Sequence, residues 1–303
     1  MERHDTELTG FVVEQSKVRL YSKSVGRLVR FVFIADVHLG IDDERGNPYR
    51  ELSSRMAGAY AATRHYRTGQ PTTPQESFLG ALRHARKRGA DLVLIGGDLL
   101  SFPSCAAAEW ARARLDEAMV PFLYVAGNHD WHFEGMPGSS AELRAWGERR
   151  LTALYGDRDP LMASCDLNGL RLVLIDNGTY EITPEQLAYY RDRAAAGLPT
   201  VLIVHSPLYV PGRDVGYGCG HPEWGAATDR NHKIERREQW PQTGHTETTM
   251  TFRREVFGTP NLLGVFAGHT HRPAIDVVSG VPLFVTPATA QGGFLEVEIA
   301  PTP

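Results

Sequence analysis

The stretch that decides the fold is Leu28-Val29-Arg30-Phe31-Val32-Phe33-Ile34-Ala35, followed at once by Asp36-Val37-His38. The run is short, mostly apolar and rich in β-branched and aromatic residues, which is typical of a strand buried on both faces. Asp36 and His38 then stand at its carboxyl end. If the extended backbone continues through them, both side chains point to the same side and can hold one ion. The pattern therefore predicts a buried strand that ends in a metal-binding pair.

The same arrangement recurs further along the chain. Metal-capable side chains closely follow each of four more apolar runs, at 92–95, 122–125, 201–204 and 262–266. The motifs in these places are Gly97-Asp98, Gly127-Asn128-His129-Asp130, His205 and Gly268-His269-Thr270-His271. In open α/β sheets, ligands bind in the crevice outside the carboxyl ends of the strands. The runs therefore predict an α/β fold with one shared site, where glycines at 96, 97, 127 and 268 let the backbone turn sharply.

Together the motifs supply seven side chains that suit a site for two metal ions: Asp36, His38, Asp98, Asn128, His205, His269 and His271. The set mixes carboxylate and amide oxygens with imidazoles and contains no thiolate, which suits Mn, Fe, Zn or Co. Two such ions about 3.5–4 Å apart can clamp the attacking and leaving oxygens of an in-line displacement at phosphorus. Taken alone, each motif more often forms a turn or a hydrogen-bonded polar group in the core than a metal site. The ordered set favours metal-dependent phosphoester hydrolysis.

The succession D-x-H, G-D, G-N-H-D, H and G-H-x-H spans residues 36 to 271 and resembles the calcineurin-like metallophosphoesterases. The resemblance implies a four-layer α/β/β/α sandwich of two mixed sheets, packed face to face and flanked by helices. It also implies two divalent or trivalent ions, bridged by Asp98 and a hydroxide. One ion would be held by Asp36, His38, Asp98 and His271, and the other by Asp98, Asn128, His205 and His269.

Two departures separate the chain from two branches of this family. Phosphoprotein phosphatases carry G-D-x-x-D-R, whose second aspartate buttresses the histidine of G-N-H, but Ser101 stands at that position here. Purple acid phosphatases place a tyrosine ligand at the same position, which Ser101 also excludes. His129 is therefore expected to lack one orienting partner.

The expected chemistry follows from charge. Two divalent ions, two carboxylates and a bridging hydroxide leave a net charge of about +1, which attracts a phosphate oxyanion, and coordination lowers the pKa of water from 15.7 to about 7. With the bridging Asp98, His129 is the candidate catalytic residue, as the general acid for the leaving oxygen. A phosphate contact and a supporting hydrogen bond beside Asn128 are the alternatives for His129. Asp130 is expected to support the ligands.

Substrate contacts are expected from Asn128, His129 and Arg272, although Arg272 is equally consistent with a surface charge. The whole chain, residues 1–303, is expected to form a single domain with insertions at about 42–72 and 209–248. The first insertion is predicted to contain a polar helix near the site. The second is rich in glycine and proline and begins four residues after His205, so one end must lie at the site.

We interpret the 209–248 insertion as a substrate cap, with a surface excursion over the sheet edge as the alternative. Its three histidines, at 221, 232 and 245, are expected to be solvated or structural and not to bind metal.

Regular elements are expected between the metal motifs. Capping boxes at 73–76 and 183–186 predict helices that end before Gly89 and Gly197. Further helices are predicted at 104–119 and 140–154. Hairpin turns are predicted at Asn168-Gly169 and Ser279-Gly280, and a last strand at 294–299.

Bulk properties exclude several classes of protein. The three cysteines, Cys105, Cys165 and Cys219, are odd in number and far apart, which predicts reduced thiols and not a disulfide framework. Apolar runs stay well short of the roughly 18 residues of a transmembrane helix, and the N-terminus lacks a signal pattern, so the cytoplasm is the expected location. A formal net charge of −4 gives no basic footprint for long nucleic acid, although a nucleotide substrate stays open.

Two other functions stay open. The run Asp36-Val37-His38-Leu39-Gly40 resembles the start of recombination-associated nucleases. A nuclease or a cyclic-nucleotide phosphodiesterase of the same fold is therefore one alternative. A non-catalytic docking scaffold is the other, but such modules usually lose metal ligands and none of the seven is missing here.

Overall fold

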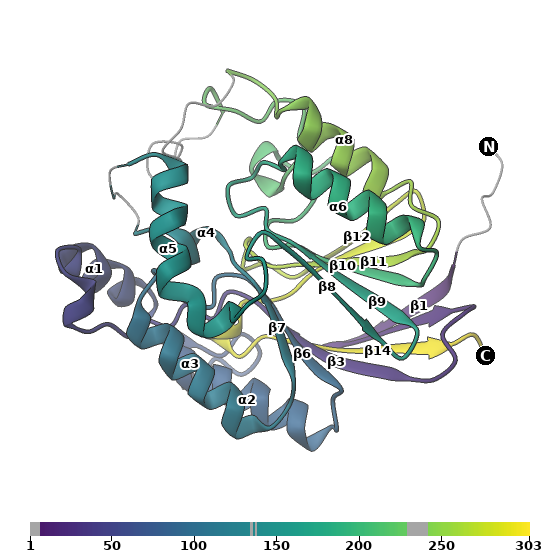
Figure 1. The fold of residues 1–303 in the computed structure, drawn as a ribbon. Coiled ribbons are helices and arrows are strands. Elements are labelled where there is room, and N and C mark those ends of the chain that lie inside the picture. Colours follow the sequence, from purple (N-terminus) through teal and green to yellow (C-terminus); the bar gives the residue numbers. More distant parts are fainter. Residues whose placement is uncertain (1–6, 134–135, 137, 229–241) are drawn as a thin grey trace.

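The computed structural model describes residues 7–133, 136, 138–228 and 242–303, and these form two six-stranded mixed sheets packed face to face (Figure 1). Helices α2 (Pro74–Lys87), α3 (Cys105–Ala118) and α5 (Ser140–Tyr155) cover the outer face of one sheet. Helices α6 (Pro184–Ala195) and α8 (Glu247–Val256) cover the outer face of the other. The expected four-layer α/β/β/α sandwich is confirmed.

The first sheet has the strand order β1-β2-β14-β3-β6-β7. Its members are β1 (Leu8–Glu14), β2 (Lys17–Ser22), β3 (Val29–Ile34), β6 (Leu92–Gly96), β7 (Phe122–Val125) and β14 (Leu295–Pro301). Strands β3, β6 and β7 run parallel, and β14 lies inside the sheet, antiparallel to β3. The β1–β2 hairpin was not predicted, because its strands are only partly buried and carry no long apolar run.

The second sheet has the order β12-β13-β11-β10-β9-β8. Its members are β8 (Met162–Leu167), β9 (Leu170–Ile175), β10 (Thr200–Ile203), β11 (Leu262–Ala267), β12 (Ala274–Val278) and β13 (Val281–Val285). The β8–β9 and β12–β13 hairpins turn at the predicted Asn168-Gly169 and Ser279-Gly280. All four turn residues have positive φ, the requirement of a two-residue type I′ turn.

The apolar runs are continuous because both faces of their strands are buried. In β3, Phe31 and Phe33 pack between the sheets, whereas Val32 and Ile34 pack on the helical side. Helices α2 and α6 begin at the predicted capping boxes, where Thr73 and Thr183 accept hydrogen bonds from the third helical N–H. The packing therefore accounts for the apolar strands, and the caps account for where these two helices begin.

Two segments stand outside this frame. Residues 42–72 contain the 3₁₀ turn η1 (Glu44–Gly46), the expected helix α1 (Arg50–Tyr60), and the short strands β4 (Thr63–Arg64) and β5 (Pro71–Thr72). Residues 209–248 contain the 3₁₀ turn η2 (Val215–Tyr217) and the start of α8, while His232 and Trp240 lie outside the described residues. Every described helix is too short or too polar to span a lipid bilayer.

Candidate metal centre

The carboxyl ends of parallel strands from both sheets meet at one place and bring the predicted ligands together. Two groups of potential donor atoms each lie within 4.8 Å of one another: Asp36, His38 and His271 in one, and Asp98, His205 and His269 in the other. Asn128, at the start of α4 (Asn128–Trp131), places Oδ1 3.1 Å from Nε2 of His205. All seven candidate ligands therefore lie at this centre.

The backbone reaches these positions through strained conformations. Five of the seven candidates, all within the described residues, have φ between 48° and 70°: Asp36, His38, Asp98, His269 and His271. The extended backbone that we predicted through Asp36 and His38 is wrong, because β3 ends at Ile34 and both residues are left-handed. Left-handed non-glycine residues are costly and concentrate at functional sites. Main-chain bonds hold them here, since Asp36 and Val37 donate to Gly97 and Asp98 at 3.0 and 2.8 Å.

Glycines are required at this centre, but mostly because there is no room for a side chain and not because the backbone turns sharply. Gly97 does adopt positive φ, at 91°, whereas Gly96, Gly127 and Gly268 do not. At Gly127 a Cβ would lie 2.2 Å from Oδ1 of Asp98, and at Gly268 a Cβ would lie 2.5 Å from Oδ2 of Asp36. The carboxylates of the site occupy the space that a side chain would need.

In the first group, Nε2 of His38 lies 2.9 Å from Nε2 of His271, which is 3.5 Å from Oδ1 of Asp36. Burial, together with the charges of His129 and His271, holds the pKa of His38 well below its ordinary value, so its ring is neutral. Nδ1 of His38 is buried without a hydrogen-bond partner among the described residues. The ring is held instead by Tyr60 of α1, stacked on it in parallel at 3.8 Å.

In the second group, His205 is fixed in one orientation. Its Nδ1 lies 2.9 Å from the carbonyl oxygen of Gly96, and this bond leaves Nε2 directed at Oδ2 of Asp98, 3.3 Å away. A hydrogen bond at one ring nitrogen determines which nitrogen can bind a metal. Asp98 also belongs to a third group with His38 and His129. It therefore lies between the two sets of donors, where a bridging carboxylate would have to be.

The ring of His129 contacts a main-chain oxygen in place of the missing aspartate. Its Nδ1 lies 3.3 Å from the main-chain oxygen of Ser101, the residue that replaces the buttressing aspartate. Its N–H donates to Oδ1 of Asp98 at 2.9 Å, and its ring stands perpendicular to His38 at 5.0 Å. Asp130 accepts the N–H groups of Leu100 and Gly127, both at 2.8 Å. It therefore ties the Asp98 loop to the Asn128 loop.

A sixth strand end contributes residues that were not predicted. Asn177, just after β9, accepts the N–H groups of His205 and Ser206 at 3.0 and 2.9 Å. Tyr180 places Oη 2.7 Å from Nε2 of His269. The pair Asp176-Asn177 follows a buried apolar run just as the metal motifs do, so the signal for this strand end was present in the sequence. Tyr60 and Tyr180 carried no comparable signal.

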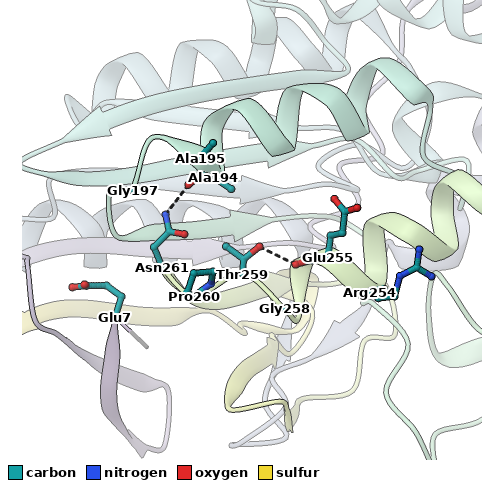
Figure 2. A pocket seen from close by; sticks show the side chains of 10 residues that line it. All are labelled: Glu7, Ala194, Ala195, Gly197, Arg254, Glu255, Gly258, Thr259, Pro260 and Asn261. Carbon is teal, nitrogen blue, oxygen red and sulfur yellow. Dashed lines mark hydrogen bonds between the residues drawn. The ribbon is translucent and has the colours of Figure 1, made fainter. Parts of the chain in front are cut away.

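A cavity of about 670 Å³ lies away from the donor groups, beside the entry into β10 and β11 (Figure 2). Figure 2 shows the amide of Asn261 directed at the carbonyl of Ala194, 3.1 Å away, and the hydroxyl of Thr259 donating to Glu255 at 2.8 Å. These polar groups are already paired within the protein, and none of the seven candidate ligands lines the cavity.

A cavity of about 450 Å³ does adjoin the candidate centre. It is lined by His269, Thr270 and Arg272, and also by Arg213 and Tyr217 of the 209–248 insertion. Arg213 is paired with Asp276, whereas Arg272 is exposed. Arg272 is therefore not part of the donor groups, but it borders the space beside them.

The donor set fits a pair of metal ions. The groups offer carboxylate oxygens, one amide oxygen and imidazole nitrogens, with no thiolate, which is the chemistry of Mn, Fe, Zn and Co sites. The main-chain bond of His205, the stacking on His38 and the strained backbone hold these atoms together before any ion binds.

Comparison with known proteins agrees with this geometry. A model of the calcineurin-like phosphoesterase family matches residues 29–273. A dimetal phosphatase from Danio rerio has a TM-score of 0.51 at 14% identity, over 88% of this chain and 89% of that chain. A purple acid phosphatase from yellow lupin (Lupinus luteus) seeds has a TM-score of 0.52 at 13% identity, over 91% of this chain and 46% of that chain. No curated protein matches the sequence.

The class that these findings define is the metal-dependent hydrolases of phosphoesters. The chain belongs to the calcineurin-like phosphoesterase family, whose metal centre is dinuclear. The likeness to the two solved structures shows the shared fold.

Metal binding is expected to release protons. Burial opposes the charged form of His205, but the carboxylate of Asp98 outweighs it and raises the pKa of His205 to about 10. The ring is therefore protonated at neutral pH without metal, and an ion must displace that proton. Zinc affinity should rise with pH up to about 10. Calorimetric titration at pH 7 in two buffers of different ionisation enthalpy should show release of at least about one proton, and a buffer-independent enthalpy would contradict this.

Proposed function

We propose that the seven candidate ligands hold two metal ions and that the chain hydrolyses a small phosphoester, a monoester or a diester, between them. The observation that carries this proposal is the place of Asp98, whose carboxylate belongs both to the group around His205 and His269 and to a group with His38. When bound, the ions supply an activated water at neutral pH and neutralise charge on the phosphoryl oxygens.

The chain's own residues supply the remaining steps. His129 stands at the edge of both donor groups, and its partly exposed ring can reach the leaving oxygen and give it a proton. The Ser101 carbonyl near Nδ1 can accept a hydrogen bond from that nitrogen and leaves Nε2 to face the substrate. To act as the acid, the ring must carry a second proton on Nε2, and this is the proton that passes to the leaving oxygen. Arg272 lines the cavity beside His269 together with Arg213 and Tyr217, and this supports a role in binding the leaving group for Arg272 and for that segment of the insertion.

A small substrate is favoured over a long nucleic acid. Tyr60 from one insertion lies over His38, and Tyr180, backed by Trp224 of the other insertion, lies beside His269. Both flanks of the centre are therefore built up by aromatic side chains. The formal net charge of −4 also offers no electrostatic attraction for a polyanion.

The test is hydrolysis of an aryl phosphate, a bis-aryl phosphate and duplex DNA by protein stripped with a chelator and reloaded with Mn, Fe, Zn or Co. We expect turnover of at least one aryl ester, lost on stripping and restored on reloading, because the nucleophile depends on the ions. Turnover of DNA alone would favour the nuclease alternative. Two bound ions with no turnover of any substrate would contradict the proposed function.

A further inference from the structure

We propose that Tyr180 is a positioning residue: its hydroxyl holds the ring of His269, and the 209–248 insertion holds Tyr180 through Trp224. This inference rests on the proposed two-metal site. It gives the insertion a role in metal binding that the interpretation as a substrate cap does not include.

The first observation is the contact between the two rings. Oη of Tyr180 lies 2.7 Å from Nε2 of His269, and the rings meet edge to face with centroids 5.1 Å apart. An imidazole whose Nε2 is engaged by a hydroxyl offers Nδ1 to a metal ion. Histidine ligands commonly donate their second ring nitrogen to such a partner, which fixes both tautomer and orientation.

The second observation is that Tyr180 itself is held rigidly. Its φ of 63° is left-handed, its N–H donates to the carbonyl of Asn177 at 2.7 Å, and the residue is only 2% exposed. Asn177 also binds the main chain of His205. The same short loop after β9 therefore supports both histidines of the second donor group.

The third observation is a stack of side chains that the insertion contributes. The ring of Trp224 lies against Tyr180, with centroids 4.7 Å apart and an angle of 21°. His245 lies on Trp224 at 5.3 Å and 10°. Nδ1 of His245 is 3.0 Å from Glu181, the residue next to Tyr180. The stack therefore begins and ends on neighbouring residues, which prevents the phenol from swinging away from His269.

The two hypotheses about the 209–248 insertion predict different effects on metal affinity. If it only covers substrate, its side chains should affect selectivity and leave metal affinity unchanged. If it supports Tyr180, weakening the stack of side chains should lower the affinity of the protein for one of the two ions. Loss of a partner of a metal-binding histidine typically costs about 10–100-fold in metal affinity.

The decisive variant is Tyr180→Phe, which keeps the stacked ring and removes only the hydroxyl. The matched control is Tyr190→Phe, since Tyr190 is equally buried and its hydroxyl bonds Thr259 away from the centre. Zinc binding would be measured by titration calorimetry and by metal analysis after dialysis. We expect about 10–100-fold weaker binding at one of two sites in Tyr180→Phe, with the other site and the control unchanged.

A second variant, Trp224→Leu, removes the stack and keeps the phenol. We expect a smaller loss at the same site. Unchanged zinc affinity in Tyr180→Phe would overturn the proposal. Equal weakening of both sites, together with a lower melting temperature of the metal-free protein than in the control, would also overturn it, because it would show a general structural role.

Iron loading distinguishes positioning from direct ligation. A tyrosinate bound to Fe(III) gives a visible charge-transfer band. We expect no charge-transfer band that depends on Tyr180. A band that is present in the unmodified protein and absent from Tyr180→Phe would show that Tyr180 is a ligand, and would overturn the positioning role. Because these measurements need no substrate, their outcome is separate from the test of hydrolysis. A chain that binds two ions without turnover would contradict the proposed function alone.

Discussion

Replacing Asp98 with asparagine is expected to strip at least one metal ion from the protein and to abolish phosphoester hydrolysis. A neutral amide cannot balance two cations, and Asp98 is the carboxylate that lies within reach of both donor groups. Since loss of a mere supporting partner costs about 10–100-fold in metal affinity, loss of the shared ligand should cost at least about 100-fold. Metal content after dialysis and turnover of an aryl phosphate would measure both effects.

The metal-free variant should still fold. It should be less stable than the unmodified protein without metal, because the carboxylate of Asp98 makes attractive contacts with His205 and His129, which hold its pKa well below its ordinary value although burial opposes its charge. Asp91→Asn is a suitable control, because Asp91 accepts a hydrogen bond from Arg30 at the opposite end of the sheet. Two tightly bound ions and wild-type turnover in Asp98→Asn would refute the shared position.

Replacing His129 with alanine is expected to keep both ions and to slow poor leaving groups far more than good ones. A general acid typically contributes about 10²–10⁴-fold, but only where the departing oxygen needs a proton. Alkyl phosphates should therefore lose about 10²–10⁴-fold in kcat, while an activated aryl phosphate should change little. The measurement is kcat across a series of esters that differ in leaving-group pKa.

The outcome also separates the alternatives for His129. Equal losses for all esters would indicate phosphate binding or positioning, and loss of metal would indicate that the ring is a ligand beside His38 and Asp98. His84→Ala serves as the control, because His84 pairs with Glu296 on the outer side of the first sheet, away from the centre. Its ester series should match that of the unmodified protein.

Strand and helix positions were predictable because their causes are local. A buried strand needs an uninterrupted apolar run, a hairpin needs two residues that tolerate positive φ, and a helix start needs a cap. The runs before Asp36 and Asp98 met the first condition, and Asn168-Gly169 met the second. The β1–β2 hairpin lacked a strong run and was missed.

The candidate site was predictable in its members but not in its construction. The side chains of the seven predicted ligands do lie together, yet Asp36 and His38 reach their places through left-handed backbone and not through an extended strand. That conformation depends on main-chain bonds to Gly97 and Asp98, which follow strand β6 and come about 60 residues later in the chain. No short window of sequence contains both partners.

By itself, the sequence determined the chemistry of the donors and their order on the strands, since residue type and apolar periodicity are properties of short segments. Only the tertiary structure decided which nitrogen each histidine presents and what holds its ring. Tyr180 and His269 are 89 residues apart, and Tyr60 reaches His38 from an insertion. Such contacts depend on how the two sheets and their insertions pack, because the orientation of a side chain is set by whichever neighbours fill the space around it.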